Sequence, residues 1–237
     1  MNTKAYKDIF FDFDDTLFDT HKDTNNALQE TAVEFGFDKL YPDLNVFFQQ
    51  FWVNGMKLFN NEGNKHIEYV KRIADCCRKT LCHMSDFHAT DSDYDRMSTF
   101  LIARFKEKGT VLEGVPRLMS TLRQKGYRLH LASNGIHDIQ IAKLERTDML
   151  QYFDTVLVAS DIGVFKPVKG FWVEALNRSK AEANTSLMVG DNYFTDVVGA
   201  MDMGIDTVLL NRWQADFQPP KQPTFTIADI NELDTIL

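Results

Sequence analysis

Five short apolar runs constrain the fold more than any other feature of the sequence. Each run has the length of a strand and is rich in β-branched or aromatic residues. The runs cover residues 9–11, 127–132, 155–159, 186–189 and 207–210. Helical patterns separate the later runs, and strand–helix alternation of this kind predicts an α/β fold with a Rossmann-like parallel sheet covered by helices on both faces.

The expected helices have recognisable start and stop signals. One follows Gly114, carries Pro116 in its first turn and ends before Gly126. Three others are expected at 136–149, 167–178 and 195–203. Each lies between two apolar runs, which is the position of the crossover helices in a parallel sheet.

About a hundred residues between the first two apolar runs show helical patterns and no strand pattern. A loop of that length inside a compact domain is abnormal, so residues 19–113 are predicted to form an inserted α-helical cap domain. Residues 1–18 and 114–237 then form the catalytic core. Aromatic residues recur at helical spacing in the insertion, and they are expected mainly in the core of the cap, with stacking on a nucleobase as the alternative. These residues are Phe47, Phe48, Phe51, Trp52 and Phe59.

The charge balance argues against two classes of partner. The 237-residue chain has a formal net charge of −8, which repels nucleic-acid backbones and anionic lipid surfaces. We find neither a signal segment nor an apolar run long enough to span a membrane, so the prediction is a cytoplasmic protein that binds no nucleic acid and no membrane. A monomer and a homodimer are both open.

Three cysteines lie close together in the predicted cap, at Cys76, Cys77 and Cys82. Their odd number does not suggest a disulfide framework. With His83 and His88 they could form a zinc site, but the spacing fits no established ligand pattern. Buried helix cysteines are the expected structure.

Polar side chains follow each of the first four apolar runs. Ligands of parallel α/β sheets bind beyond the carboxyl ends of the strands, so these residues are expected to meet at one edge. In chain order they are Asp12, Asp14 and Thr16, then Ser133 and Asn134, then Lys166, and finally Asp191 and Asp196.

Four motifs in this order resemble those of the haloacid dehalogenase-like hydrolase superfamily, over nearly the whole chain. The matching positions are Asp12, Asp14 and Thr16 for the first motif, Ser133 for the second, Lys166 for the third, and Gly190, Asp191 and Asp196 for the fourth. The helical insertion is similar to the cap of the branch that carries its cap between the first two motifs. Residues 144–153 and 226–233 look like segments of nucleoside 5′-monophosphate phosphatases, and phosphoglycolate phosphatase-like members of the branch are also similar.

The resemblance implies a Mg²⁺ cofactor. The carboxylates of Asp12 and Asp191 and the main-chain oxygen of Asp14 would be its protein ligands, since Mg²⁺ prefers oxygen. Ser133, the Asn134 amide and Lys166 would bind the phosphoryl group of the substrate.

The implied reaction begins with an attack of Asp12 on phosphorus, which gives an aspartyl-phosphate. Asp14 would protonate the leaving alcohol and then activate the water that hydrolyses the intermediate. Thr16 and Asp196 would support the site, Asp196 by holding Lys166 or a metal-bound water. Members of the family that cleave carbon–halogen bonds lack an aspartate equivalent to Asp14, so its presence favours phosphoryl transfer.

The leading prediction is therefore a phosphatase acting on small-molecule phosphate monoesters, with nucleoside 5′-monophosphates as the first candidates. A sugar-phosphate mutase of the same branch is the second hypothesis, since it needs the same motifs and a cap that excludes water. A catalytically idle binding or regulatory scaffold is the third, although no motif residue is missing.

Overall fold

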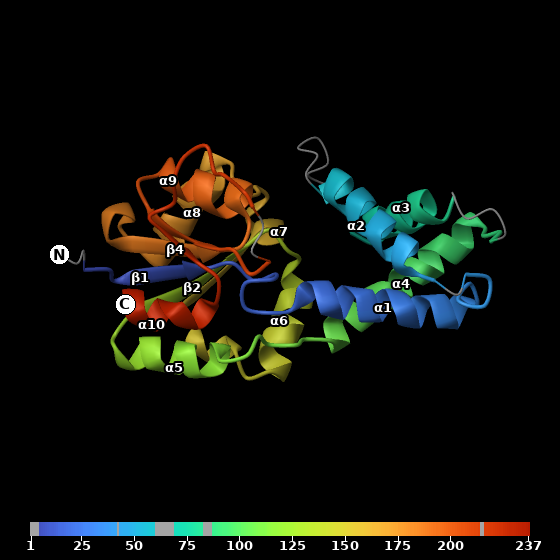
Figure 1. The fold of residues 1–237 in the computed structure, drawn as a ribbon, viewed down its shortest axis with the longest axis horizontal. Coiled ribbons are helices and arrows are strands. Elements are labelled where there is room, and N and C mark those ends of the chain that lie inside the picture. Colours follow the sequence, from blue (N-terminus) through green and yellow to red (C-terminus); the bar gives the residue numbers. More distant parts are fainter. Residues whose placement is uncertain (1–4, 42, 60–68, 83–86, 214–215) are drawn as a thin grey trace. The chain divides into compact units, whose positions relative to one another are not determined.

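The computed structural model describes residues 5–41, 43–59, 69–82, 87–213 and 216–237. The chain divides into two compact units. Met1–Thr20 and Gly109–Leu237 form the first, which we call the sheet unit, and His21–Lys108 forms the second, the helical unit (Figure 1). The assignment of residues 19–113 to a cap domain that selects the substrate stays a prediction.

The sheet unit is built on parallel strands. Among the described residues, six strands form one sheet in the order β3-β2-β1-β4-β5-β6. They are β1 (Asp8–Phe11), β2 (Arg128–Ser133), β3 (Thr155–Val158), β4 (Ser186–Gly190), β5 (Asp206–Leu210) and β6 (Phe225–Ile227). The first five match the predicted runs to within one residue at each end. The sixth was not predicted, because a strand of three residues is too short to show a periodic pattern.

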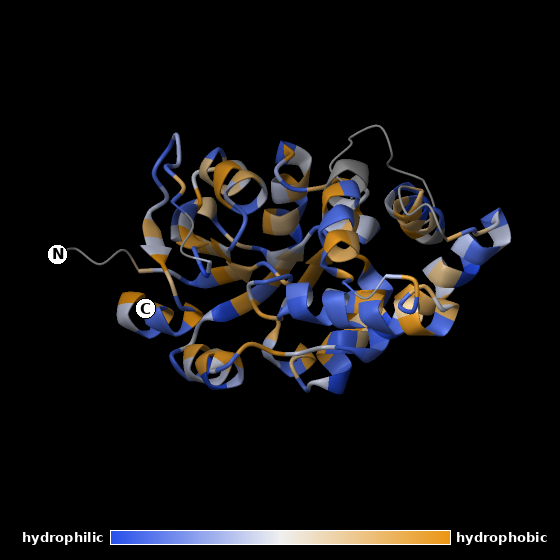
Figure 2. Ribbon diagram, turned by 45° about the vertical axis from the view of Figure 1, so that its right-hand side comes forward, coloured by the Kyte–Doolittle hydropathy of each residue, from blue (hydrophilic) through white to orange (hydrophobic). Residues whose placement is uncertain are grey.

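Helices cover both faces of this sheet (Figure 1). Alternate residues of a strand point to opposite faces, so Ile9 and Phe11 pack in one core and Phe10 packs in the other. On the first face lie α5 (Val115–Gln124), α6 (His137–Arg146), η2 (Leu150–Tyr152), η5 (Ile230–Glu232) and α10 (Leu233–Ile236). On the second lie α7 (Ala159–Ile162), α8 (Lys169–Ser179), η3 (Ala183–Thr185) and α9 (Gly199–Met201). Figure 2 shows the apolar residues gathered on the strands and on the helix sides that face them. The predicted Rossmann-like α/β fold is confirmed.

The segment after β4 differs from the expected α-helix at 195–203. It forms a π-helix, η4 (Tyr193–Val198), followed by the short α9. The side chain of Asn192 caps it by accepting hydrogen bonds from the main-chain N–H groups of Phe194 and Thr195, at 3.0 and 3.2 Å. This turn places Asp196 directly behind the end of β4, because its Oδ2 accepts from the Asn192 N–H at 3.0 Å. Single π turns are common at functional sites.

The helical unit contains α1 (Thr20–Phe35), α2 (Asn45–Phe59), α3 (Tyr69–Leu81) and α4 (Asp91–Glu107). Phe47 and Phe51 are buried in its core and Phe48 packs against that core. Trp52 is partly exposed, with its ring stacked on His21 at 4.8 Å between centroids. The expected core role thus holds for the first three aromatic residues, whereas the side chain of Phe59 lies outside the described part of the structure.

The cysteines of α3 divide into two kinds. Cys76 and Cys77 are buried, and burial raises the pKa of the Cys76 thiol to about 12, which keeps it protonated. Cys82 is exposed, which corrects the expectation that all three are buried. His83 lies outside the described residues. None of the helices that the structure describes is long and apolar enough to cross a membrane.

Candidate active site

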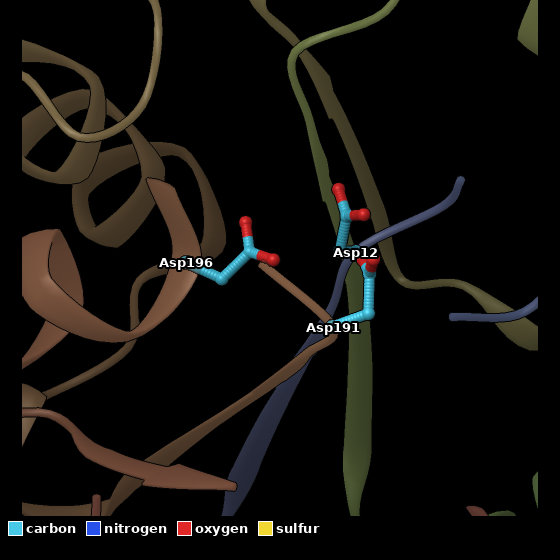
Figure 3. Close-up of side chains that lie close together, drawn as sticks. All are labelled: Asp12, Asp191 and Asp196. Atoms are coloured by element: carbon cyan, nitrogen blue, oxygen red, sulfur yellow. The ribbon is translucent and has the colours of Figure 1, made fainter. Parts of the chain in front are cut away.

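Carboxylates from two strand ends and one helix meet at the carboxyl edge of the sheet. Asp12 follows β1, Asp191 follows β4 and Asp196 lies in η4. One carboxylate oxygen from each of the three lies within 4.8 Å of the other two, and Figure 3 shows Asp12 beside Asp191 with Asp196 directed toward both. Asp12 is 7% exposed and Asp196 is fully buried. Such a concentration of buried negative charge needs cations nearby.

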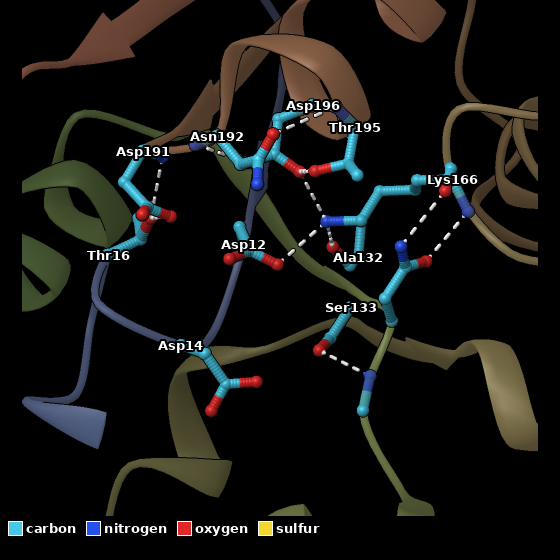
Figure 4. Close-up of polar contacts among 12 residues, drawn as sticks. Asp12, Asp14, Thr16, Ala132, Ser133, Lys166, Asp191, Asn192, Thr195 and Asp196 are labelled. Carbon is cyan, nitrogen blue, oxygen red and sulfur yellow. Dashed lines mark hydrogen bonds and ion pairs between the residues drawn. The ribbon is translucent and has the colours of Figure 1, made fainter. Parts of the chain in front are cut away.

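Lys166 supplies one of these cations. It follows α7 and is 3% exposed, and its ammonium group donates three hydrogen bonds that use all of its protons. The acceptors are Asp12 Oδ1 at 2.7 Å, Asp196 Oδ1 at 2.7 Å and the main-chain oxygen of Ala132 at 2.6 Å (Figure 4). The ammonium therefore fixes the orientation of one oxygen of Asp12.

The charges of the cluster are strongly coupled. Burial raises the pKa of Asp12 to about 8, against the lowering effect of Lys166, and Asp196 and Asp14 raise it further. Burial likewise raises the pKa of Asp191 to about 9, with Asp12 and Asp196 as additional causes. Burial alone would lower the pKa of Lys166, but the Asp12 and Asp196 carboxylates raise it overall, so Lys166 stays charged.

Hydroxyl and main-chain groups hold the remaining carboxylates. Asp191 Oδ1 accepts from the Thr16 hydroxyl at 3.3 Å, and the Thr16 Oγ1 in turn accepts from the Asp191 N–H at 3.0 Å. Thr16 thus joins the loop after β1 to the end of β4. Asp196 Oδ1 accepts from Thr195 Oγ1 at 3.0 Å as well as from Lys166, and its Oδ2 accepts from Asn192. Both oxygens of Asp196 are therefore engaged within the protein, in a position to support Lys166.

Asp14 has its own set of donors. Thr20 Oγ1 donates to Asp14 Oδ1 at 2.7 Å, and Gln140 Nε2 donates to Asp14 Oδ2 at 3.3 Å. Gln140 Nε2 also donates to Ser133 Oγ at 2.6 Å. The structure thereby connects the loop after β1 with the end of β2 through one side chain of α6.

Asn134 lies beside Ser133, but its side chain faces Lys166. Its Nδ2 donates to the Lys166 main-chain oxygen at 2.9 Å, and its Oδ1 accepts from the Lys166 N–H at 2.7 Å. The side-chain amide is thus occupied in fixing the Lys166 backbone, whose peptide bond to Pro167 is cis. Any contact of Asn134 with substrate falls to its main chain.

The chain is similar in sequence to known proteins. The family described as haloacid dehalogenase-like hydrolase matches residues 9–210. The chain belongs to the haloacid dehalogenase-like hydrolase family. A glyceraldehyde 3-phosphate phosphatase of Methanothermobacter thermautotrophicus is 30% identical, with 86% of this chain and 85% of the relative aligned. The pyrimidine 5′-nucleotidase YjjG of Escherichia coli is 25% identical over 97% of this chain and 96% of that protein.

The fold agrees with solved structures of this family. The HAD-hydrolase YfnB of Bacillus subtilis, solved with magnesium bound, superposes with a TM-score of 0.80 at 23% identity, covering 98% of this chain and 99% of the other. At that identity the likeness concerns the fold alone. The predictions of a haloacid dehalogenase-like fold and of a hydrolase are confirmed.

Sequence motifs did not reveal every polar group at this candidate site. Gln140 and Thr20, which hold Asp14, lie outside the four motifs. Arg212 was also missed: its guanidinium lies 3.6 Å from Asp15 Oδ1 and 3.3 Å from Asp19 Oδ2, on the loop that carries Asp14. The available signal for Gln140 was its place in the first turns of the helix after Ser133, which keeps it close to that strand end.

Metal-free protein is expected to lose stability as pH rises from about 5 to about 9. Asp12 and Asp191 have folded-state pKa values of about 8 and about 9, above the value of about 3.9 for an unfolded aspartate. The folded state therefore binds their protons more tightly, and this stabilisation is lost as pH rises through the folded values. In EDTA, Asp191→Asn should gain stability relative to the wild type across that range. Thermal unfolding of both proteins at each pH measures this difference in stability. A difference that does not change with pH would contradict the raised pKa of Asp191.

Proposed function

We propose that the protein hydrolyses phosphate monoesters of small molecules through an aspartyl-phosphate on Asp12. One observation carries the proposal. Lys166 fixes Asp12 Oδ1, whereas Asp12 Oδ2 accepts no hydrogen bond from the described residues. A buried carboxylate with one oxygen held and the other available is suited to nucleophilic attack.

The charge of the site supports a Mg²⁺ cofactor. When all are ionised, the three carboxylates and the Lys166 ammonium leave a net charge of −2 in a buried cluster, which a divalent cation balances. Asp12 and Asp191 would bind it through carboxylate oxygens and Asp14 through its main-chain oxygen, a donor set that Mg²⁺ prefers. When bound, Mg²⁺ would offset the repulsion between the substrate phosphate and these carboxylates. At an effective dielectric constant of about 20, this repulsion reaches about 4 kcal/mol for each pair of unit charges about 4 Å apart.

Side chains of the protein carry out the remaining steps of the reaction. The Ser133 hydroxyl donates to a phosphoryl oxygen, and the Lys166 ammonium, whose three protons are engaged, places positive charge nearby while Asp12 attacks phosphorus and the bond to the leaving oxygen breaks. Asp14 gives its proton to the leaving alkoxide and then takes a proton from the water that hydrolyses the aspartyl-phosphate. Asn134 contributes indirectly, because its side chain fixes the Lys166 backbone.

Nucleoside 5′-monophosphates are the substrate class that we propose to test first. A pyrimidine 5′-nucleotidase aligns along almost the full length of this chain, which supports the choice. The helical unit would select among substrates, since core motifs of this kind determine the reaction and not the molecule. Asp14 supports ester hydrolysis over carbon–halogen cleavage, because a halide needs no proton to leave.

A phosphate-release panel with and without Mg²⁺ tests the proposal. It should include pyrimidine and purine nucleoside 5′-monophosphates, glyceraldehyde 3-phosphate and hexose phosphates. We expect Mg²⁺-dependent release, with the highest kcat/KM on a nucleoside 5′-monophosphate. Conversion of a hexose 1-phosphate to its 6-phosphate isomer would favour a mutase. No phosphate release from any substrate of the panel would refute the hydrolase chemistry.

Asp191→Asn is expected to raise the Mg²⁺ concentration for half-maximal activity by at least about 10-fold, because even outer-shell changes cost metal sites that much. The variant loses one charged oxygen ligand but keeps its size. Asp202→Asn is the matched control, since Asp202 is an exposed acid of the same unit and lies 3.6 Å from Lys221. Mg²⁺ titration of initial rates measures both. An unchanged half-saturation in Asp191→Asn would remove Asp191 from the metal site.

A further inference from the structure

Gln140 makes contacts that none of the four motifs requires. It lies on α6, is 2% exposed, and uses one nitrogen to reach two groups of the site. Nε2 donates to Ser133 Oγ at 2.6 Å and to Asp14 Oδ2 at 3.3 Å. The amide thus joins the group proposed to bind phosphate to the group proposed to protonate the leaving oxygen.

The orientation of this amide follows from its neighbours. The NH₂ end of Gln140 faces both the Asp14 carboxyl group and the Ser133 hydroxyl, whose oxygens accept its two hydrogen bonds. The other end, Oε1, is buried and has no hydrogen-bond partner among the described residues. A buried acceptor without a donor is unfavourable, and an apolar side chain at this position would avoid it. The two donated bonds are therefore what this amide contributes.

Gln140 also determines how Ser133 can act. Ser133 Oγ accepts from Gln140 at 2.6 Å and from the main-chain N–H of Gly135 at 3.1 Å. A hydroxyl has two acceptor sites and one proton, so both acceptor sites are filled. No acceptor for that proton is present among the described residues. The Ser133 hydroxyl is thereby left as a donor, which is the role that binding a phosphoryl oxygen requires.

Gly135 provides the space for this side chain. A Cβ atom placed on Gly135 would lie 1.9 Å from Gln140 Nε2 and 2.6 Å from its Cδ. Real Cβ atoms do not approach that closely, so alanine at 135 would displace the amide. The Gly135 backbone has no positive φ, so its conformation does not exclude alanine and the collision with Gln140 is the expected effect.

We infer that Gln140 is a positioning residue that holds the Asp14 carboxyl group and the Ser133 hydroxyl in a fixed relation for phosphoryl transfer. The inference rests on the proposed function, because it assigns Gln140 a role through the general acid of that reaction. A carboxyl group that is free to rotate would meet the leaving oxygen less often, and small misplacements can cost about 100-fold in rate.

Substrates with different leaving groups test the inference. An alkoxide needs a proton from Asp14, whereas p-nitrophenolate leaves without one. We expect Gln140→Met to lower the ratio of kcat/KM for the best alkyl phosphate of the panel to kcat/KM for p-nitrophenyl phosphate by about 10- to 100-fold. Gly135→Ala should reproduce the drop, and Gln140→Glu gives a third variant of unchanged size. The ratio is the readout because loss of fold alone would lower both substrates equally.

Gln124→Met is the matched control. Gln124 is an exposed helix residue whose Nε2 also donates to a serine hydroxyl, that of Ser120 at 3.3 Å. The same substitution there should leave the ratio within about two-fold of the wild type, the variation expected for a surface change.

Asp14→Asn separates this inference from the proposed function. It should lower the same ratio on its own, and adding Gln140→Met to it should lower the ratio no further, because Gln140 acts through Asp14. An unchanged ratio in Asp14→Asn would overturn the acid role and the inference with it. Two results would overturn the role of Gln140 alone. The first is a ratio that drops in Asp14→Asn but not in Gln140→Met, Gln140→Glu or Gly135→Ala. The second is a double variant in which the two drops in the ratio are fully additive.

Discussion

Asp12→Asn is expected to abolish Mg²⁺-dependent phosphate release, lowering kcat by at least about 10⁴-fold, since loss of the nucleophile costs enzymes with covalent intermediates up to about 10⁶-fold. The amide keeps the shape of the carboxylate and can still accept a hydrogen bond from Lys166. It lacks the charge needed to attack phosphorus. Initial rates on an aryl phosphate measure the loss. Acid-quenched wild type should carry phosphate on the peptide that contains Asp12, and the variant should not.

The same substitution should not destabilise the protein, which separates loss of chemistry from loss of fold. Asp12 is one of three acids around a single ammonium group, and Asp14 and Asp196 raise its pKa by repulsion. Removing one negative charge relieves that repulsion, so in EDTA at pH 8 the melting temperature should stay the same or rise. An Asp12→Asn protein that is folded and retains more than about 1% of wild-type kcat would exclude the covalent mechanism.

Hydrophobic patterns predicted the sheet because burial is local in sequence. Each of β1 to β5 is an apolar run, and parallel strands are buried on both faces. The strand order was not predictable in the same way, since β1 pairs with β2 and β4 through contacts that no single run encodes. The π-helix η4 was not predicted for a related reason: its wide turn depends on the cap at Asn192 and the position of Asp196.

The site was predictable as far as its residues directly follow strands. The ends of parallel strands share one edge, so spacing alone was enough to place Asp12, Ser133 and Asp191 together. The orientation of a side chain depends on neighbours from other elements, and there the sequence was insufficient. The Asn134 side chain binds the Lys166 backbone, so the predicted contact of Asn134 with phosphate is left to its main chain, and the bridge made by Gln140 depends on how α6 packs.

Lys166→Met is expected to destabilise the metal-free protein by about 3–5 kcal/mol at pH 8, the range found when one member of a buried ion pair is removed. Lys166 donates to both Asp12 and Asp196 and is almost fully buried. Methionine fills similar volume but leaves these carboxylates without a cation. For a chain of this size, that loss lowers the melting temperature by roughly 6–20 °C. Activity should also disappear, because Lys166 orients Asp12 and, in the proposed mechanism, places positive charge beside the phosphoryl group.

The pH dependence of the destabilisation in Lys166→Met identifies its cause. Lys166 lowers the pKa of Asp12, so in the variant the acids keep their protons to higher pH and the missing charge matters less in acid. The destabilisation should therefore shrink between pH 8 and pH 5, and Mg²⁺ should recover part of it at pH 8 by supplying positive charge. Lys169→Met is the control, since Lys169 is exposed three residues away and should change the melting temperature little. Equal destabilisation at both pH values would mean that Lys166 stabilises the fold by packing, and the charge balance inferred for this site would be wrong.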